Sequence, residues 1–136
     1  MTCTINASVS SSGIVSTADG SGVLKIQSDG KTTNALAWVN FDGTLTSPIT
    51  PRANYNMSSI TKSGTGDYIC NFTSALSDAN YSVSGTALAT VNSSTYTGVT
   101  IKYTTTFSTT AFSITVKNDA GASVDSSIVC VQVHGN

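Results

Sequence analysis

Several side chains that could contact a ligand or join subunits lie between residues 36 and 72. Trp38 and Phe41 carry aromatic faces, which complement the C–H groups of a sugar ring and could form a stacking platform. The residues beside them are also apolar, and this favours a second role, in which both rings are buried in the core or in a seam between subunits. Both roles stay open at this point, and burial is the prediction.

The same stretch holds the only arginine of the chain. Arg52 follows a proline at the entrance to a predicted strand that contains Tyr55, and Asp67 begins another strand. An ion pair between Arg52 and Asp67, within one subunit or between two, is predicted. The planar guanidinium of Arg52 could equally grip an anionic sugar with two hydrogen bonds.

A polar loop supplies a second set of candidate contacts. In NSSTYTG (92–98) no apolar alternation requires Tyr96 to be buried, so we expect an exposed ring among amides and hydroxyls, as in loops that bind neutral carbohydrate. The alternative is a ring folded back over its own hairpin. Phe107, in TTTFSTT, is a weaker candidate of the same kind. The predicted ligand contacts are Asn92, Ser94, Thr95, Tyr96 and Phe107.

Catalytic chemistry has little support in the sequence. His134 is the only histidine, it lies near the end of the chain, and no GxSxG nucleophile motif accompanies it. Asp19, Asp29 and Asp42 each precede a glycine and are typical of turns rather than of a hydrolytic carboxylate pair. No calcium-binding DxDxDG loop is present. We expect neither an enzyme nor a bound cofactor or metal.

The composition predicts which kind of fold must position these residues. The chain has 136 residues, with 22 serines, 22 threonines and no glutamate, so residues that favour helix interiors are scarce. An all-β fold is expected. Only 10% of residues are charged and the net charge is −1, which argues against a nucleic-acid partner. Neither a signal peptide nor a membrane span is recognised.

Turn signals and apolar alternation divide the chain further. Residues 1–22 predict an extended stalk or linker, and residues 23–136 a single antiparallel β-sandwich domain. Asp29 and Gly30 predict a loose hairpin, and the prolines predict a loop or sheet edge in 42–52. Tyr55 and Met57 are expected on one strand face. Other buried faces are predicted for Tyr68, Cys70 and Phe72; for Phe112, Ile114 and Val116; and for Val129, Val131 and Val133 in a central strand.

Three cysteines at irregular spacing, Cys3, Cys70 and Cys130, predict neither a zinc site nor a disulfide framework. Small buried thiols are the expected state. A bridge between Cys70 and Cys130 stays open, because both lie in strand-like runs.

Four segments, taken in order, resemble the C-terminal tip domain of bacteriophage tail fibres and receptor-binding proteins. They are TNALAWVNFDGT, RANYNMSSITKSGTGDYICNF, SDANYSV and VCVQVHGN, and the likeness covers residues 23–136. The residues that match its central pattern are Trp38, Asn40, Phe41, Arg52, Tyr55 and Asp67. Cys70 departs from the threonine, valine or isoleucine expected there, which affects only local packing.

The resemblance implies a homotrimeric β-sandwich in the virion, attached to the rest of a tail fibre, that adheres to bacterial surface polysaccharide. Polar loops with a few aromatic rings are the expected contact, and Trp38, Phe41, Arg52, Tyr55 and Asp67 are expected to be structural or interface residues. A trimerisation or folding cap without a ligand is the main alternative. A small polysaccharide hydrolase is a further one.

Overall fold

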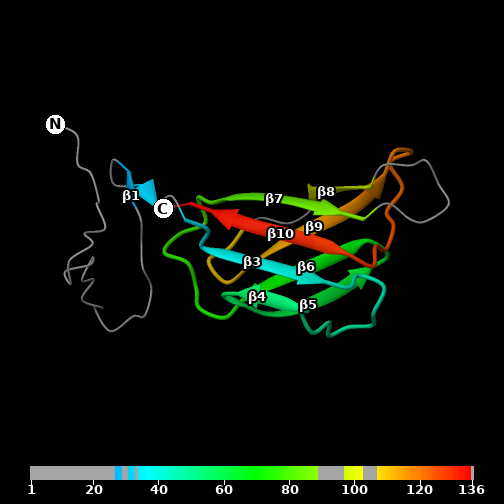
Figure 1. The fold of residues 1–136 in the computed structure, drawn as a ribbon, viewed down its shortest axis with the longest axis horizontal. Coiled ribbons are helices and arrows are strands. Elements are labelled where there is room, and N and C mark those ends of the chain that lie inside the picture. The colour runs from blue at the N-terminus through cyan, green and yellow to red at the C-terminus, as the bar shows by residue number, and fades with distance from the viewer. Residues whose placement is uncertain (1–26, 29–30, 33, 89–96, 103–106, 136) are drawn as a thin grey trace, which may run out of the picture.

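The structure, a computed structural model, describes residues 27–28, 31–32, 34–88, 97–102 and 107–135. These residues form strands, turns and loops but no helix, so the all-β prediction is confirmed, and no helix long and apolar enough to cross a bilayer occurs among them. Figure 1 labels the strands, whose bounds are β1 (Gln27–Ser28), β2 (Lys31–Thr32), β3 (Ala37–Phe41), β4 (Ala53–Tyr55), β5 (Met57–Gly64), β6 (Asp67–Phe72), β7 (Ser82–Ala87), β8 (Thr97–Ile101), β9 (Ala111–Asn118) and β10 (Val129–His134).

Eight of the strands form one antiparallel sheet in the order β4-β3-β10-β7-β8-β9-β6-β5, and β1 pairs only with β2. In Figure 1, β7, β10 and β3 run side by side in front of β9 and β6. The last strand, β10, lies between β3 and β7, which confirms its predicted central position. The pairing of Gln27 with Thr32 confirms the predicted hairpin, although it lies outside the large sheet.

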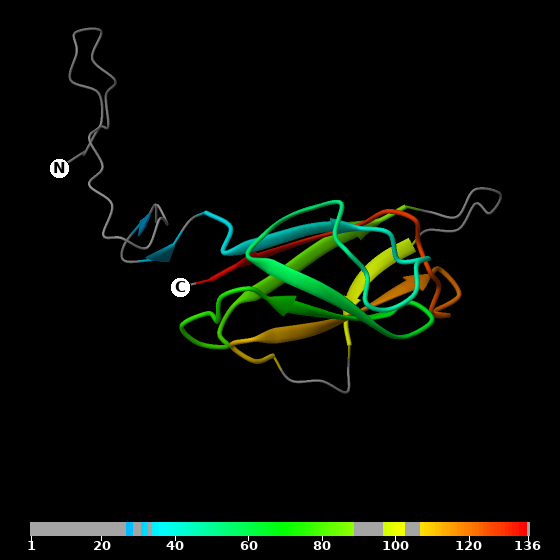
Figure 2. The ribbon, with the colours of Figure 1, turned by 90° about the horizontal axis from the view of Figure 1, so that it is seen from below.

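The sheet curls until its two edges are neighbours in sequence. The edge strand β4 ends at Tyr55, the opposite edge strand β5 begins at Met57, and only Asn56 separates them. Asn56 adopts a left-handed backbone conformation, with φ of 52°, which asparagine tolerates better than most residues. Figure 2 shows the resulting shape, a sheet almost closed into a barrel.

This turn corrects one sequence-based prediction. Tyr55 and Met57 were expected on one strand face, but the side chain of Tyr55 is 40% exposed and that of Met57 is buried. The period-2 rule for strands fails here because the chain changes direction at Asn56.

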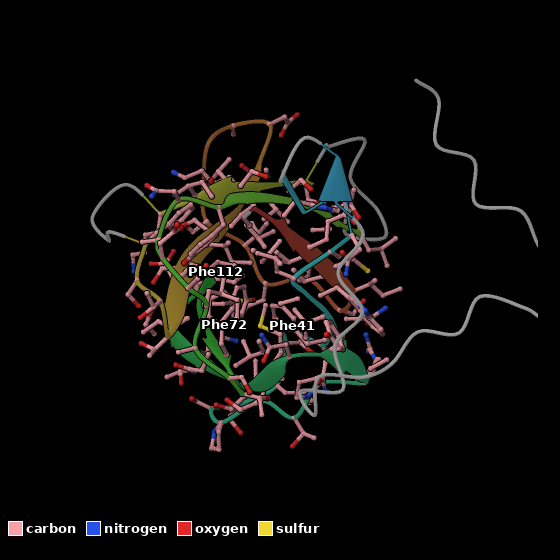
Figure 3. All side chains as sticks on the ribbon, turned by 90° about the vertical axis from the view of Figure 1, so that its left-hand side faces the viewer. Phe41, Phe72 and Phe112 are labelled. Atoms are coloured by element: carbon pink, nitrogen blue, oxygen red, sulfur yellow. The ribbon has the colours of Figure 1, made fainter. Side chains whose placement is uncertain are left out.

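The core fills the inside of the curled sheet. The predicted buried faces of β6, β9 and β10 are all confirmed, and Ala37, Val39 and Phe41 of β3 join them. Figure 3, a view along the barrel, shows Phe41, Phe72 and Phe112 inside the ring of strands. The ring of Phe41 meets Tyr68 edge to face, with centroids 5.1 Å apart.

A cluster of paired polar groups closes one end of the barrel. We call it the polar hub and define it as Asp125, Lys62, Tyr68 and the backbones of Gly43 and Gly66. One oxygen of Asp125 accepts hydrogen bonds from the Tyr68 hydroxyl (2.9 Å) and the Gly66 amide (2.8 Å), and the other accepts one from Lys62 Nζ (2.7 Å). The Gly43 carbonyl accepts a hydrogen bond from Lys62 Nζ and also lies 2.9 Å from the Tyr68 hydroxyl, whose single proton is shared between this carbonyl and Asp125.

The turn between β5 and β6 contributes directly to this hub. Gly66 has φ of 70° and lies so close to Val116 and Val124 that a Cβ atom would come within 3 Å of their backbones. Gly66 is therefore required both by the backbone conformation and by packing, and it presents its N–H group to Asp125.

The two described cysteines are free. The Cys70 side chain is buried, and this burial raises the pKa of its thiol, whereas Cys130 belongs to the opposite, half-exposed side of the sheet. The bridge that the sequence left open is therefore not formed. Cys3 and the predicted stalk, residues 1–22, lie outside the described residues, and the trimer stays a prediction.

Candidate functional site

One side of the sheet carries large side chains and neutral polar groups together. Strands β4, β3, β10 and β7 are consecutive neighbours, and their outward side chains form what we call the outer face. Residues Tyr55, Trp38, Gln132 and Ser84 lie in register across these four strands. A second row contains Ala53, Asn40, Cys130 and Thr86. An open hollow of about 540 Å³ lies over β3, β10 and β7.

Trp38 and Tyr55 are cross-strand partners in the first of these rows. Their side chains are 41% and 40% exposed, while Phe41, on the same strand as Trp38, is fully buried. Burial of Phe41 is thus confirmed, but Trp38 is not part of the core of its own chain. A stacking platform made of Trp38 and Phe41 is also wrong, because successive odd and even positions of β3 face opposite sides.

The polar members of the outer face are amides and hydroxyls. Gln132, Ser84 and Thr86 are exposed, and no carboxylate, imidazole, amine or guanidinium lines the hollow, although the Cys130 thiol does. The side-chain oxygen of Asn40 is buried and has no hydrogen-bond partner among the described residues. Buried acceptors without partners are costly and uncommon, so the centre of this face is not optimised for stability alone.

Arg52 lies at one end of the outer face, and its partner differs from the predicted one. The guanidinium donates to Asp42 Oδ2 at 2.9 Å and to the Ser127 carbonyl at 2.6 Å. Hydrogen bonds from Thr44, followed by the nearby charge of Arg52, hold the pKa of the Asp42 carboxyl below its usual value. Both ends of the Arg52 guanidinium are thus engaged by the protein itself.

Asp67 makes its own ion pair elsewhere in the sheet. Its Oδ2 lies 2.8 Å from Lys102 Nζ, and its Oδ1 accepts a hydrogen bond from the Thr115 hydroxyl at 2.7 Å. Burial alone would raise the pKa of Asp67, but these two hydrogen bonds outweigh it and the pKa is lowered. The predicted Arg52–Asp67 pair does not form within the chain, because Arg52 binds Asp42 and Asp67 binds Lys102.

Phe107 is used in packing. Its ring stacks on Tyr81 with centroids 4.8 Å apart and planes 7° apart, and it also meets Phe112 edge to face. It is half-buried against the core. This corrects the prediction of an exposed ring that contacts a ligand, which failed because a neighbouring aromatic cluster in the fold was not visible in the sequence.

The other predicted contact residues, Asn92, Ser94, Thr95 and Tyr96, lie outside the described residues, and their role stays a prediction. His134 ends β10, where it pairs with Ser82. No group of three or more His, Cys, Asp or Glu residues that could hold a metal ion occurs in the described part of the chain.

Sequence reasoning missed the polar half of the outer face. Gln132, Ser84 and Thr86 are separated from Trp38 by dozens of residues, and each is unremarkable in its own segment. Their outward direction follows from alternation, but their meeting with Trp38 depends on β10 inserting between β3 and β7. Only knowledge of strand order could have brought them together.

No family model matches the chain, and no curated protein matches it at a significant level. One similar solved structure is the crystal structure of the phiAB6 tailspike in complex with three-repeated oligosaccharides of Acinetobacter baumannii surface polysaccharide. The similarity covers 71% of this chain and 19% of that one, at 17% sequence identity and a TM-score of 0.46. The bound oligosaccharide is a property of the tailspike, and a likeness of this size carries no argument about function.

Proposed function

We propose that residues 23–136 form a non-enzymatic adhesion domain of a bacteriophage tail fibre, and that its outer face binds a neutral surface polysaccharide of the host. The phage assignment rests on the four sequence segments that resemble tail-fibre tips. The carbohydrate assignment rests on one observation: two exposed aromatic side chains, Trp38 and Tyr55, are cross-strand partners on a face whose hollow is lined by amides and hydroxyls and by no charged side chain.

The chemistry of this face suits a sugar. An aromatic ring covers the apolar face of a pyranose, while amides and hydroxyls exchange hydrogen bonds with its hydroxyl groups. Gln132 is the direct cross-strand neighbour of Trp38, so a ring stacked on the indole would have an amide within reach. An anionic sugar is less suited, because Arg52 already serves Asp42 and the Ser127 carbonyl.

Three linked copies of a weak binding site would bind a cell surface with higher avidity than one copy. In the homotrimer that the sequence resemblance implies, a polysaccharide-coated cell would meet several outer faces at once, and linked sites gain avidity without any new contact. A modest affinity for each face is then compatible with firm adhesion of a virion.

The test is adsorption of the full-length chain, fluorescently labelled, to a panel of bacterial strains. We expect wild-type protein to label at least one strain, and Trp38→Ala to weaken that labelling by about tenfold or more, as loss of an aromatic anchor does. Leu45→Ala is the matched control, because Leu45 is 49% exposed and does not line the hollow. Equal labelling by all three proteins would refute a carbohydrate site on the outer face.

A second function, a trimerisation cap without a ligand, is favoured by a specific observation. Leu88 and Ile128 are 44% and 41% exposed, and a backbone hydrogen bond joins them at the end of the β7–β10 pair. Burial of this apolar end against sister chains would stabilise a trimer. Light scattering separates the two functions: if the wild-type chain is trimeric, labels no strain, and becomes monomeric as Leu88→Ser/Ile128→Ser, the cap is correct.

A further inference from the structure

A second hollow lies beside the outer face, on the far side of Tyr55. Its volume is about 340 Å³, and it is open to solvent. Three segments meet around it: residues 34–36 before β3, residues 55–56 at the junction of β4 and β5, and residues 73–77 after β6. The lining consists of amides, hydroxyls, alanines, Leu36, Leu76 and Tyr55, without a charged side chain.

The wall of this hollow is held in place by Asn56. Its side-chain oxygen accepts a hydrogen bond from the Ser74 amide at 2.8 Å, and its side-chain nitrogen donates to the carbonyls of Ser74 (3.2 Å) and Leu36 (3.4 Å). The Asn56 carbonyl also accepts from the Thr73 amide. The residue that turns the chain between the two sheet edges therefore also fixes the loop that forms the hollow.

Tyr55 links this hollow to the outer face. It lines the second hollow and is the register partner of Trp38, which lines the first. From Tyr55 to Ser84 the first row crosses three strand spacings, or about 14 Å at about 4.8 Å each. That distance is longer than one sugar ring, and the second hollow extends it further.

We infer that the two hollows are adjacent subsites of one groove, which binds an internal stretch of a linear neutral polysaccharide rather than a single terminal sugar. This inference rests on the proposed function. A site for a chain end encloses one ring, whereas both hollows here are open, and Tyr55 of the second hollow is the cross-strand neighbour of Trp38 of the first. The exposed side chains of Thr73 and Ser74 would contact sugar units next to the one stacked on Trp38.

The experiment uses the full-length chain and the purified surface polysaccharide of a strain that it labels. Partial acid hydrolysis of that polymer gives a ladder of oligosaccharides, and calorimetry measures the dissociation constant for each length, with methyl glycosides of the component sugars as the shortest probes. We expect affinity to rise by about tenfold, equivalent to about 1.4 kcal/mol, between one repeat unit and three.

Variants separate the two subsites. In the double variant Thr73→Ala/Ser74→Ala, most of the increase in affinity with oligosaccharide length should be lost. The variant should still bind the shortest oligosaccharides with wild-type affinity. Thr65→Ala/Ser123→Ala, at exposed positions on the opposite end of the barrel, is the matched control and should bind every length like wild type.

The outcomes distinguish this inference from the proposed function. If affinity is independent of length, or if the Thr73/Ser74 variant matches its control, the single-groove inference is wrong, while a polysaccharide site around Trp38 can stand. If the chain labels no strain and no oligosaccharide binds, both are wrong.

Discussion

The polar hub and the outer face use polar groups in opposite ways. In the hub, the carboxylate of Asp125 accepts three hydrogen bonds from side chains and backbone, and its partners Lys62 and Tyr68 share a second acceptor, the Gly43 carbonyl. On the outer face, one buried acceptor, on Asn40, lacks a partner among the described residues, and an indole is 41% exposed. The polar groups of the hub are paired within the chain, whereas the outer face leaves an indole, an amide and hydroxyls exposed.

This difference shows that a chain with few charged residues uses them for structure and leaves neutral groups for ligand recognition. All three ion pairs of the described residues are spent on joining strands and loops: Asp42 with Arg52, Asp125 with Lys62, and Asp67 with Lys102. Recognition is then left to rings, amides and hydroxyls. A surface of this kind responds little to salt, because neutral contacts are not screened by ions.

The largest expected effect contrasts two aromatic residues of β3. Phe41→Ala should lower the free energy of unfolding by about 3–5 kcal/mol, because its ring is fully buried. If each chain folds alone, Trp38→Ala should lower the free energy of unfolding by only about 1 kcal/mol, because a cross-strand side-chain pair contributes an energy of that size. Urea denaturation of both variants measures this. Equal losses would mean that Trp38 is buried by another chain.

Removal of the hub carboxylate comes next in size. Asp125→Ala should cost about 3 kcal/mol in the free energy of unfolding, because it leaves the largely buried Lys62 charge without its partner. Asp119→Ala, at an exposed turn position, is the control and should be close to neutral. Adsorption per folded molecule should be unchanged in both variants. If Asp125→Ala abolished adsorption by a still-folded protein, the division between hub and outer face would fail.

Acid should destabilise the fold through its paired carboxylates, one of which is the Asp125 carboxylate of the hub. Burial alone would raise the pKa of Asp125, but hydrogen bonds from Lys62, Gly66 and Tyr68 outweigh it and lower the pKa; that of Asp67 is lowered as well. A lowered folded-state pKa gives stability that is complete above the unfolded-state pKa of about 4 and is lost as pH falls further. The urea concentration at the midpoint of unfolding, measured from pH 6 to pH 2, should therefore be constant above about pH 4 and should decrease at lower pH. Asp125→Asn should flatten that drop.

The smallest expected effect tests the unpaired acceptor. Asn40→Val replaces a partnerless amide oxygen by a β-branched side chain that suits a strand, so the free energy of unfolding should stay the same or rise by about 1 kcal/mol. Polysaccharide binding should weaken in the same variant. A clear loss of stability would show that Asn40 is retained for folding and not for contact.

Sequence patterns predicted the inside of this molecule well. Alternation placed Tyr68, Phe112 and Val131 correctly, because each lies in a regular strand where neighbouring positions face opposite sides. Alternation failed at Tyr55, because Asn56 turns the chain there. It also failed at Trp38: apolar residues on both faces of β3 predicted a strand buried on both sides, but in the described part of the chain the Trp38 side chain is exposed.

The candidate site could be predicted only in part. Stacking by Trp38 was considered from its residue type, although burial was the prediction, and Tyr55 was expected only as a structural or interface residue. Gln132, Ser84 and Thr86 join them through strand order, which is set by the whole fold. Ion-pair partners were unpredictable for the same reason: Arg52 pairs with Asp42 ten positions away, although Asp67 was the partner expected from the sequence.

Fluorescence of Trp38 tests the central claim most directly, because it is the only tryptophan in the chain. The full-length protein is titrated with the surface polysaccharide of a strain that it labels, while emission and quenching by iodide are recorded. If the outer face binds the sugar, emission shifts to shorter wavelength and iodide quenching falls. The polysaccharide concentration at half of this change should equal the concentration that halves adsorption of the protein to cells. Polysaccharide that binds without changing either signal would contradict the claim.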